Sequence, residues 1–155
     1  MKKLLVLSSI LFLISCNSEQ YSNADIEQEI IKITDEYNQV WETVDMDSVA
    51  HYHDENIRYY WHGFLASSSN QEFLKVFKDW MATTKVWDME VENYDVQVIN
   101  KDLAIIGFNS SSSTTILTSG EKYDYGTGAF TYIWKQINGE WKIIHIHESV
   151  LEKEN

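Results

Sequence analysis

The side chains in this sequence that are most able to do acid–base or metal chemistry are its five histidines: His51, His53, His62, His145 and His147. A neutral imidazole can take up a proton near pH 7, and it can also bind zinc. His145 and His147 stand two residues apart, so on a strand they would share one face with about 7 Å between their Cβ atoms. A zinc site would need a third ligand, which only His62 or a carboxylate such as Glu148 could supply. Because Glu148 is expected on the opposite strand face, the ligand set is incomplete and we predict no metal. We also predict no cofactor.

A general base in this chain would be His62, His145 or His147, oriented by a carboxylate or a tyrosine hydroxyl in a dry aromatic pocket. Such a base could take a proton next to a carbonyl group or activate a water molecule. His51 and His53 are expected in one short helix, where side chains two residues apart diverge by ~200°. We recognise no Ser-His-Asp arrangement, glycine-rich phosphate loop or paired-carboxylate motif in the sequence. The sequence therefore permits acid–base catalysis without indicating one reaction.

The closing hairpin decides which residues face each other. Asn138-Gly139 is typical of a two-residue type I′ turn, because both positions accept positive φ. Counting outward without a bulge pairs residues whose side chains share one sheet face: Gln136 with Trp141, Trp134 with Ile143, Tyr132 with His145, and Phe130 with His147. The opposite face would carry Ile144, Ile146 and Glu148 beside Ile133. We therefore expect both histidines on an aromatic wall, with Glu148 turned away from it.

Hydrophobic periodicity places the helices early and most of the strands late in the chain. The expected elements are a helix from 22 or 23 to 44, a short helix over 47–54, a strand over 57–62, a helix over 69–81, and strands over 86–98, 103–117, 123–136 and 140–149. The third helix is expected to bury Phe73, Val76, Phe77, Trp80 and Met81. A change of phase near Asn93 predicts a β-bulge. Ser110 to Thr115 fits either a solvated strand or a flexible linker. This order predicts an α+β fold in which a curved antiparallel sheet packs on about three N-terminal helices.

Aromatic side chains could line a concave pocket for a small apolar molecule. The expected ligand-binding residues are Tyr60, Trp61, Phe64, Trp87, Phe108, Tyr125, Tyr132 and Glu148. Aromatic residues can equally fill the core, which we expect of Trp80 and Trp134. A third possibility is an association module, in which the apolar outer sheet face around Ile133, Ile144 and Ile146 is buried between two protomers.

The N-terminus is typical of an exported protein. Lys2-Lys3 precede an apolar run from Leu4 to Ile14, which is shorter than the ~20 residues that span a bilayer. With Cys16, which is the single cysteine of the chain, this pattern resembles a bacterial lipoprotein signal. The resemblance implies cleavage before Cys16 and a lipid on its sulfur, and hence a cell-envelope location at the outer membrane or in the periplasm. The expected parts are a signal peptide over 1–15, a lipidated tether over 16–23, and one domain over 24–155.

The charge balance limits the possible partners. The chain has 24 Asp and Glu residues against 12 Lys and Arg, which gives a formal net charge of −12 at pH 7. Such an acidic surface disfavours binding to nucleic acid, whose backbone is also negative. We therefore expect contact with the membrane through the lipid on Cys16 and not through a basic patch.

The element order and the closing hairpin resemble the nuclear transport factor 2-like superfamily, in particular its small SnoaL-like branch, which is related to a kinase hub domain. The shared hairpin runs from Trp134 through Asn138-Gly139 to Trp141-Lys-Ile-Ile-His145-Ile-His147-Glu-Ser149. The resemblance covers roughly residues 25–150. It implies a cone-shaped sheet closed by helices, a pocket at the open end, and a homodimer formed through the outer sheet face. Some relatives carry Arg where Glu148 stands, so a pocket for anions is not implied here.

We therefore expect a lipid-anchored cell-envelope domain that binds a small apolar or aromatic molecule. Relatives with isomerase, cyclase or dehydratase activity suggest an alternative by analogy. In that alternative the domain is a SnoaL-like isomerase, dehydratase or hydrolase that uses histidine acid–base catalysis. A dimeric association module without a ligand is the other alternative.

Overall fold

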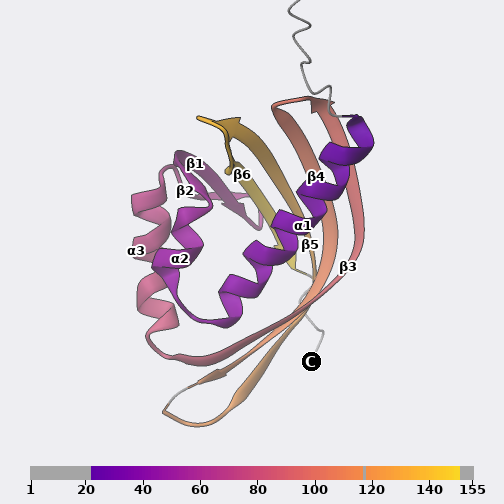
Figure 1. Cartoon of the computed structure of the whole chain (residues 1–155). Helices are drawn as coiled ribbons and strands as arrows, with labels where there is room; N and C mark the ends of the chain where they lie inside the picture. Colours follow the sequence, from indigo (N-terminus) through magenta and orange to yellow (C-terminus); the bar gives the residue numbers. More distant parts are fainter. Residues whose placement is uncertain (1–21, 117, 151–155) are drawn as a thin grey trace, which may run out of the picture.

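The computed structural model describes residues 22–116 and 118–150. The predicted signal peptide and Cys16, the predicted lipid attachment site, lie outside these residues. The elements are α1 (Asn23–Glu42), α2 (Met46–His51), β1 (His53–Trp61), β2 (Phe64–Ser67), α3 (Asn70–Met81), β3 (Thr84–Asn100), β4 (Leu103–Ile116), β5 (Lys122–Ile137) and β6 (Glu140–Val150). Figure 1 shows their arrangement.

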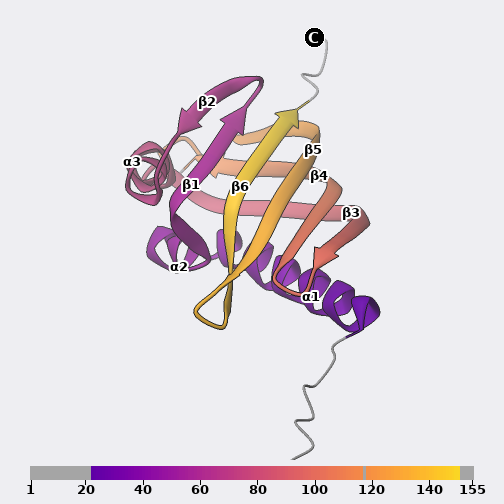
Figure 2. The same ribbon diagram turned by 90° about the horizontal axis from the view of Figure 1, so that it is seen from above.

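One six-stranded sheet organises the fold, with strand order β2-β1-β6-β5-β4-β3. All neighbouring strands are antiparallel except β1 and β6, which pair in parallel. The sheet is curved and open, and the three helices pack on one side of it (Figures 1 and 2). The predicted α+β class is therefore confirmed, and the sheet is mixed because the early strand joins the last one. Among the described residues, no helix is both long and apolar enough to cross a membrane.

Side-chain caps begin the helices where the sequence indicates. Ser22 caps α1 in a capping box with Asp25, and Ser69 accepts a hydrogen bond from the backbone amide of Glu72 at the start of α3. These caps satisfy amides that have no partner within the helix. The expected burial of Val76 is wrong, since this side chain is 49% exposed on the outer side of α3.

The second helix is shorter than predicted. α2 is capped by Asp45 and ends at His51, and His53 is already the first residue of β1. The expectation that His51 and His53 share one helix is therefore wrong. A six-residue helix has few internal hydrogen bonds, so the strand pairing of His53 with Ile143 decides the boundary.

Two irregular features of the strands agree with their sequence. The pairing of β3 with β4 shifts between Glu92 and Asp95, and Asn93 adopts a positive φ of 59°. This confirms the predicted bulge, because asparagine tolerates the left-handed region better than most residues do. The run from Ser110 to Thr115 forms part of β4, so the strand interpretation holds and the linker interpretation does not. The short edge strand β2 was not predicted.

A second bulge, which the sequence did not reveal, changes the closing hairpin. The predicted pairs hold from Ile137 and Glu140 to Trp134 and Ile143, after which Ile133 pairs with His145. Ile144 is thus the extra residue of β6, and every later side chain of this strand moves to the other face. Beyond the bulge, Tyr132 pairs with Ile146, Thr131 with His147, and Phe130 with Glu148.

The bulge reverses the predicted faces of β6 beyond Ile143. Ile146 is 3% exposed and belongs to the core, so it is not on the outer face as expected. His145 and His147 lie on the outer face and not on the aromatic wall. Glu148 lies on the inner face, where it was not expected.

Candidate functional site

A carboxyl group and a phenol meet on the inner face of the sheet. The Tyr59 hydroxyl on β1 donates a hydrogen bond of 2.8 Å to Oε2 of Glu148 on β6. The two strands pair in parallel, and the backbone amide of His62, in the turn after β1, donates to the carbonyl of Glu148 at 3.1 Å. The parallel pairing and the β6 bulge together place this acid inside the fold.

Burial changes the acid–base behaviour of this pair. It raises the pKa of Glu148, although the hydrogen bond from Tyr59 and the nearby His62 act in the opposite direction. Burial, together with the neighbouring Glu148, also raises the pKa of Tyr59 well above its ordinary value. Tyr59 therefore stays protonated and remains a donor. A carboxyl group with a raised pKa can hold a proton closer to neutral pH, so Glu148 could accept or donate one.

Aromatic rings surround the pair. Tyr59 makes edge and tilted contacts with Phe73 and Phe77 of α3, with ring centroids 5.4 and 5.5 Å apart. Phe130, which pairs with Glu148, stacks on Phe108 with a centroid separation of 5.2 Å and an interplanar angle of 5°. These rings lower the local dielectric, which strengthens any hydrogen bond made to the carboxyl group.

The three predicted catalytic histidines do not converge inside the fold. His62 is exposed in the turn between β1 and β2 at a φ of 48°. His145 stacks on Tyr60 on the outer face, with ring centroids 5.4 Å apart, and His147 is exposed beside it. Burial, with a smaller effect from His147, lowers the pKa of His145. Their catalytic roles stay predictions, but the aromatic wall that motivated them belongs to other residues.

The predicted ligand-binding residues fall into two groups. Phe108 and Tyr132 are buried on the inner face, on the same side of the sheet as Glu148. Their rings meet edge to face, with centroids 4.9 Å apart. Trp87 lies farther along the inner side of β3, where it contacts the partly exposed Tyr125. The others lie outside: Tyr60 is on the outer face, and Trp61 and Phe64 are 51% and 76% exposed at the β1–β2 turn.

Sequence reasoning missed Tyr59, which completes the site. Its signal was the alternation of β1, since Ile57 and Tyr59 are both buried while Arg58 between them is exposed. The strand was predicted, but its inner face was not assigned, because periodicity alone does not say which face meets the helices.

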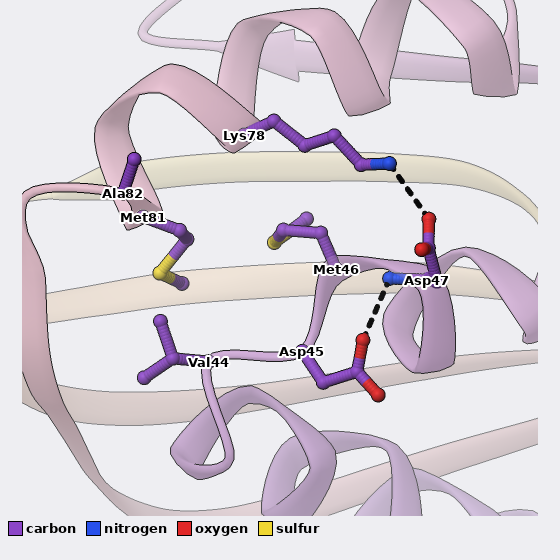
Figure 3. Close-up of a pocket in the computed structure, with 7 residues that line it drawn as sticks. All are labelled: Val44, Asp45, Met46, Asp47, Lys78, Met81 and Ala82. Atoms are coloured by element: carbon purple, nitrogen blue, oxygen red, sulfur yellow. Dashed lines mark hydrogen bonds and ion pairs between the residues drawn. The ribbon is translucent and has the colours of Figure 1, made fainter.

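Within residues 22–116 and 118–150, no group of three His, Cys, Asp or Glu side chains could hold a metal ion. Two cavities on the surface also lie away from the Tyr59–Glu148 pair. Figure 3 shows one of about 240 Å³ between α2 and α3, where Lys78 forms an ion pair of 2.7 Å with Asp47. The other, of about 290 Å³, lies beside the β5–β6 turn and is lined by residues that include His51 and Trp141. None of the predicted ligand-binding residues lines either cavity.

Comparison with known proteins gives a consistent result for the fold. The profile of the SnoaL-like domain matches residues 30–152. A protein from Novosphingobium aromaticivorans that carries the name of a scytalone dehydratase superposes with a TM-score of 0.75 at 10% identity, covering 83% of this chain and 86% of its own. A nuclear transport factor 2-like superfamily protein from Salmonella enterica superposes with a TM-score of 0.73 at 16% identity. The match covers 86% of this chain and 96% of that protein.

The association domain of CaMKII from C. elegans gives a TM-score of 0.65 at 17% identity and covers 81% of this chain and 96% of its own. No curated protein matches the chain. At these identities the solved structures share the fold, and their names describe quite different roles. The arrangement around Glu148 must therefore carry any argument about function.

Proposed function

Because the chain belongs to the SnoaL-like domain family, we propose that it binds a small, uncharged aromatic or apolar molecule on the inner face of its sheet. The observation that carries this proposal is the hydrogen bond between Tyr59 and Glu148 among aromatic rings. Apolar walls with a few fixed polar groups are the usual composition of small-molecule sites. The rings would bind the body of the ligand, and the Glu148 carboxyl group would bind a hydroxyl or carbonyl group on it.

The test is a thermal-shift screen of the mature chain, with Cys16→Ser to prevent lipidation, against uncharged aromatic compounds such as 4-hydroxybiphenyl. Binding to the folded state alone raises the melting temperature. Glu148→Gln should weaken binding about tenfold, because hydrogen bonds to a carboxylate are worth about 1.5–3 kcal/mol. Tyr59→Phe removes the donor that holds the Glu148 carboxyl group in place, so it should also weaken binding.

The chain offers a matched control for these substitutions. The exposed Tyr123 hydroxyl donates to Glu121 at 3.3 Å, so Glu121→Gln and Tyr123→Phe make the same chemical changes at the surface. These controls should bind as tightly as the unaltered chain. A screen without a single shift, or equal losses in the control pair, would contradict the proposal.

Catalysis at the same site is the second candidate function. The raised pKa of Glu148 favours it as the proton-transfer group, in place of the histidines on the outer face. The compounds that bind would be incubated in deuterated water and analysed by mass spectrometry. Deuterium uptake next to a carbonyl group that disappears in Glu148→Gln supports an isomerase or dehydratase. Binding without any chemical change supports a binding domain.

We also propose that the domain is held at the bacterial cell envelope by a lipid on Cys16. The support is the basic, apolar and cysteine-containing N-terminal pattern. Growth of expressing cells with an alkyne-bearing palmitate should label the full chain, and Cys16→Ala should abolish the label. Equal labelling of both chains, or none of either, would rule out this anchor.

A further inference from the structure

One surface cavity lies where the N-terminal helices meet the closing turn. It has a volume of about 290 Å³, which is close to the lower end of the range for small-molecule sites. Its lining includes Glu29 and Ile33 of α1, His51 and Tyr52 at the end of α2, and Trp141 of β6. Three segments that are far apart in the sequence therefore form one concave surface, which is separate from the proposed inner site.

Aromatic side chains make up much of this lining. The rings of His51 and Tyr52 meet edge to face with centroids 6.1 Å apart, and Tyr52 also packs on the buried Trp134. Trp141 is partly buried against the same core. These contacts hold the Tyr52 and Trp141 rings in place before any ligand binds. The π-systems of Trp and Tyr attract cations as well as apolar groups, so this wall suits a ligand that combines the two.

The lysine that lines the cavity has its charge compensated within the fold. The Lys142 side chain is 17% exposed and forms an ion pair of 2.8 Å with Glu140. Its ammonium group also donates to the backbone carbonyl of His51 at 2.8 Å. The hydrogen bond from Lys142 and its positive charge lower the pKa of Glu140, which therefore stays ionised at neutral pH. Together, Lys142 and Glu140 add no net charge to the cavity.

Glu29 adds a negative charge to the lining. Across residues 22–116 and 118–150, its carboxylate forms no ion pair and no side-chain hydrogen bond. Burial raises the pKa of Tyr52, and Glu36, two helical turns beyond Glu29 on the same face of α1, raises it further. The ion pair of Glu36 with Lys32, at 3.5 Å, is exposed and therefore screened by solvent. The cavity is thus bordered by negative charge, in a chain whose formal net charge is −12.

We infer that this cavity is a second binding site and that it takes a small organic cation, in which an ammonium group is carried on an apolar or aromatic body. The Glu29 carboxylate binds the ammonium group, and the rings of Tyr52 and Trp141 bind the body through apolar and cation–π contacts. An anion does not match this lining, because the one lysine in it is already paired. The inference does not depend on the proposed function of the inner face.

The experiment titrates the mature Cys16→Ser chain, labelled with ¹⁵N, with phenethylamine and with its uncharged counterpart 2-phenylethanol at pH 7, and follows amide and indole signals by NMR. Phenethylamine should bind about fivefold more tightly, which is the gain expected from one exposed ion pair. Glu29→Gln should remove this difference and leave the affinity for 2-phenylethanol unchanged. Glu27→Gln makes the same change on another face of α1 and should preserve the difference.

A second pair of variants tests the aromatic wall. Trp141→Leu should weaken binding of both compounds, whereas Trp61→Leu, at an exposed tryptophan outside the cavity, should not. If Trp141→Leu does not fold, the exposed Glu29 still provides the test, because its replacement leaves the core intact.

Three results would overturn the inference. The first is that phenethylamine does not bind, or binds no more tightly than 2-phenylethanol. The second is an equal loss of phenethylamine affinity in Glu27→Gln and Glu29→Gln. The third is displacement of phenethylamine by an excess of 4-hydroxybiphenyl, because that result would place the amine in the inner site. Failure of 4-hydroxybiphenyl to bind would contradict the proposed function alone and leave the cation site standing.

Discussion

Lowering the pH from 7 to 4 is expected to remove about 3 kcal/mol of folding free energy through His53 alone. Burial lowers the pKa of His53 from 6.5 to about 4, although its hydrogen bond to Asn70 opposes the change. Between pH 6.5 and about 4, His53 binds a proton in the unfolded chain but stays neutral in the folded chain. Stability from this source is therefore complete above pH 6.5, falls as the pH drops, and levels off below about 4.

The surroundings of His53 explain why it stays neutral. Asn70 donates from its amide nitrogen to the carbonyl of Ala50 at 3.0 Å, so its side-chain oxygen accepts from Nδ1 of His53 at 3.1 Å. Nε2 of His53 then accepts from the Tyr37 hydroxyl at 2.9 Å. Every polar atom of the neutral ring is satisfied, and the network joins α1, β1 and α3. A proton on Nε2 would place a charge among buried aromatic rings.

The measurement is urea denaturation of the unaltered chain and of His53→Gln at several pH values between 7 and 4. The variant should be less stable at pH 7 by about 1–3 kcal/mol, because it leaves part of the network unpaired. It should also lose about 3 kcal/mol less than the unaltered chain on acidification, since carboxyl groups titrate equally in both. His51→Gln, at an exposed position, is the control and should keep the full pH dependence. Parallel pH profiles for the unaltered chain and His53→Gln would show that His53 is not the source.

Replacing Trp134 by alanine should cost about 3–5 kcal/mol, which is the usual range for a buried aromatic side chain. Trp134 is fully buried, and its indole nitrogen donates to Thr34 of α1 at 3.0 Å. Its ring also makes edge contacts with Tyr37 and Tyr52. The substitution would leave a large cavity and an unpaired Thr34 hydroxyl between α1 and the centre of the sheet. The free energy of unfolding of a domain of this size is about 5–15 kcal/mol, so the substitution would remove a large part of it.

Urea denaturation checks this prediction, and two further variants keep it informative if Trp134→Ala does not fold. Trp134→Phe retains an aromatic ring and should lose less, and Thr34→Val added to it should recover part of the loss by removing the unpaired hydroxyl. Trp61→Ala is the matched control, because this tryptophan is 51% exposed, and it should change stability by about 0.5 kcal/mol or less. A similar loss for both tryptophans would contradict the assignment of Trp134 to the core.

Local signals in the sequence explain why much of the fold was predictable. The caps at Ser22 and Ser69, the change of phase at Asn93 and the Asn138-Gly139 turn each depend on a few adjacent residues. The core role of Trp134 was also predicted, because a large apolar side chain in a regular strand is usually buried. These features survive in the tertiary structure because local preference and packing favour the same conformation.

The candidate site was predicted only in part, because it depends on contacts between distant segments. Phe108, Tyr132 and Glu148 were among the expected residues, but the expected position of Glu148 was wrong. Its partner Tyr59 is 89 positions away in the chain. Their strands pair in parallel and are not joined by a turn, so no local sequence pattern predicts that they are neighbours.

The sequence by itself determined the two long helices, every strand except β2, the closing turn and the family to which these elements belong. Only the tertiary structure decided which side chains face inward at the end of the last strand. The physical reason is the bulge at Ile144, where one unpaired residue reverses the alternation of side chains. It allows Ile143 and Ile146 both to enter the core, places His145 and His147 outside, and turns Glu148 toward Tyr59.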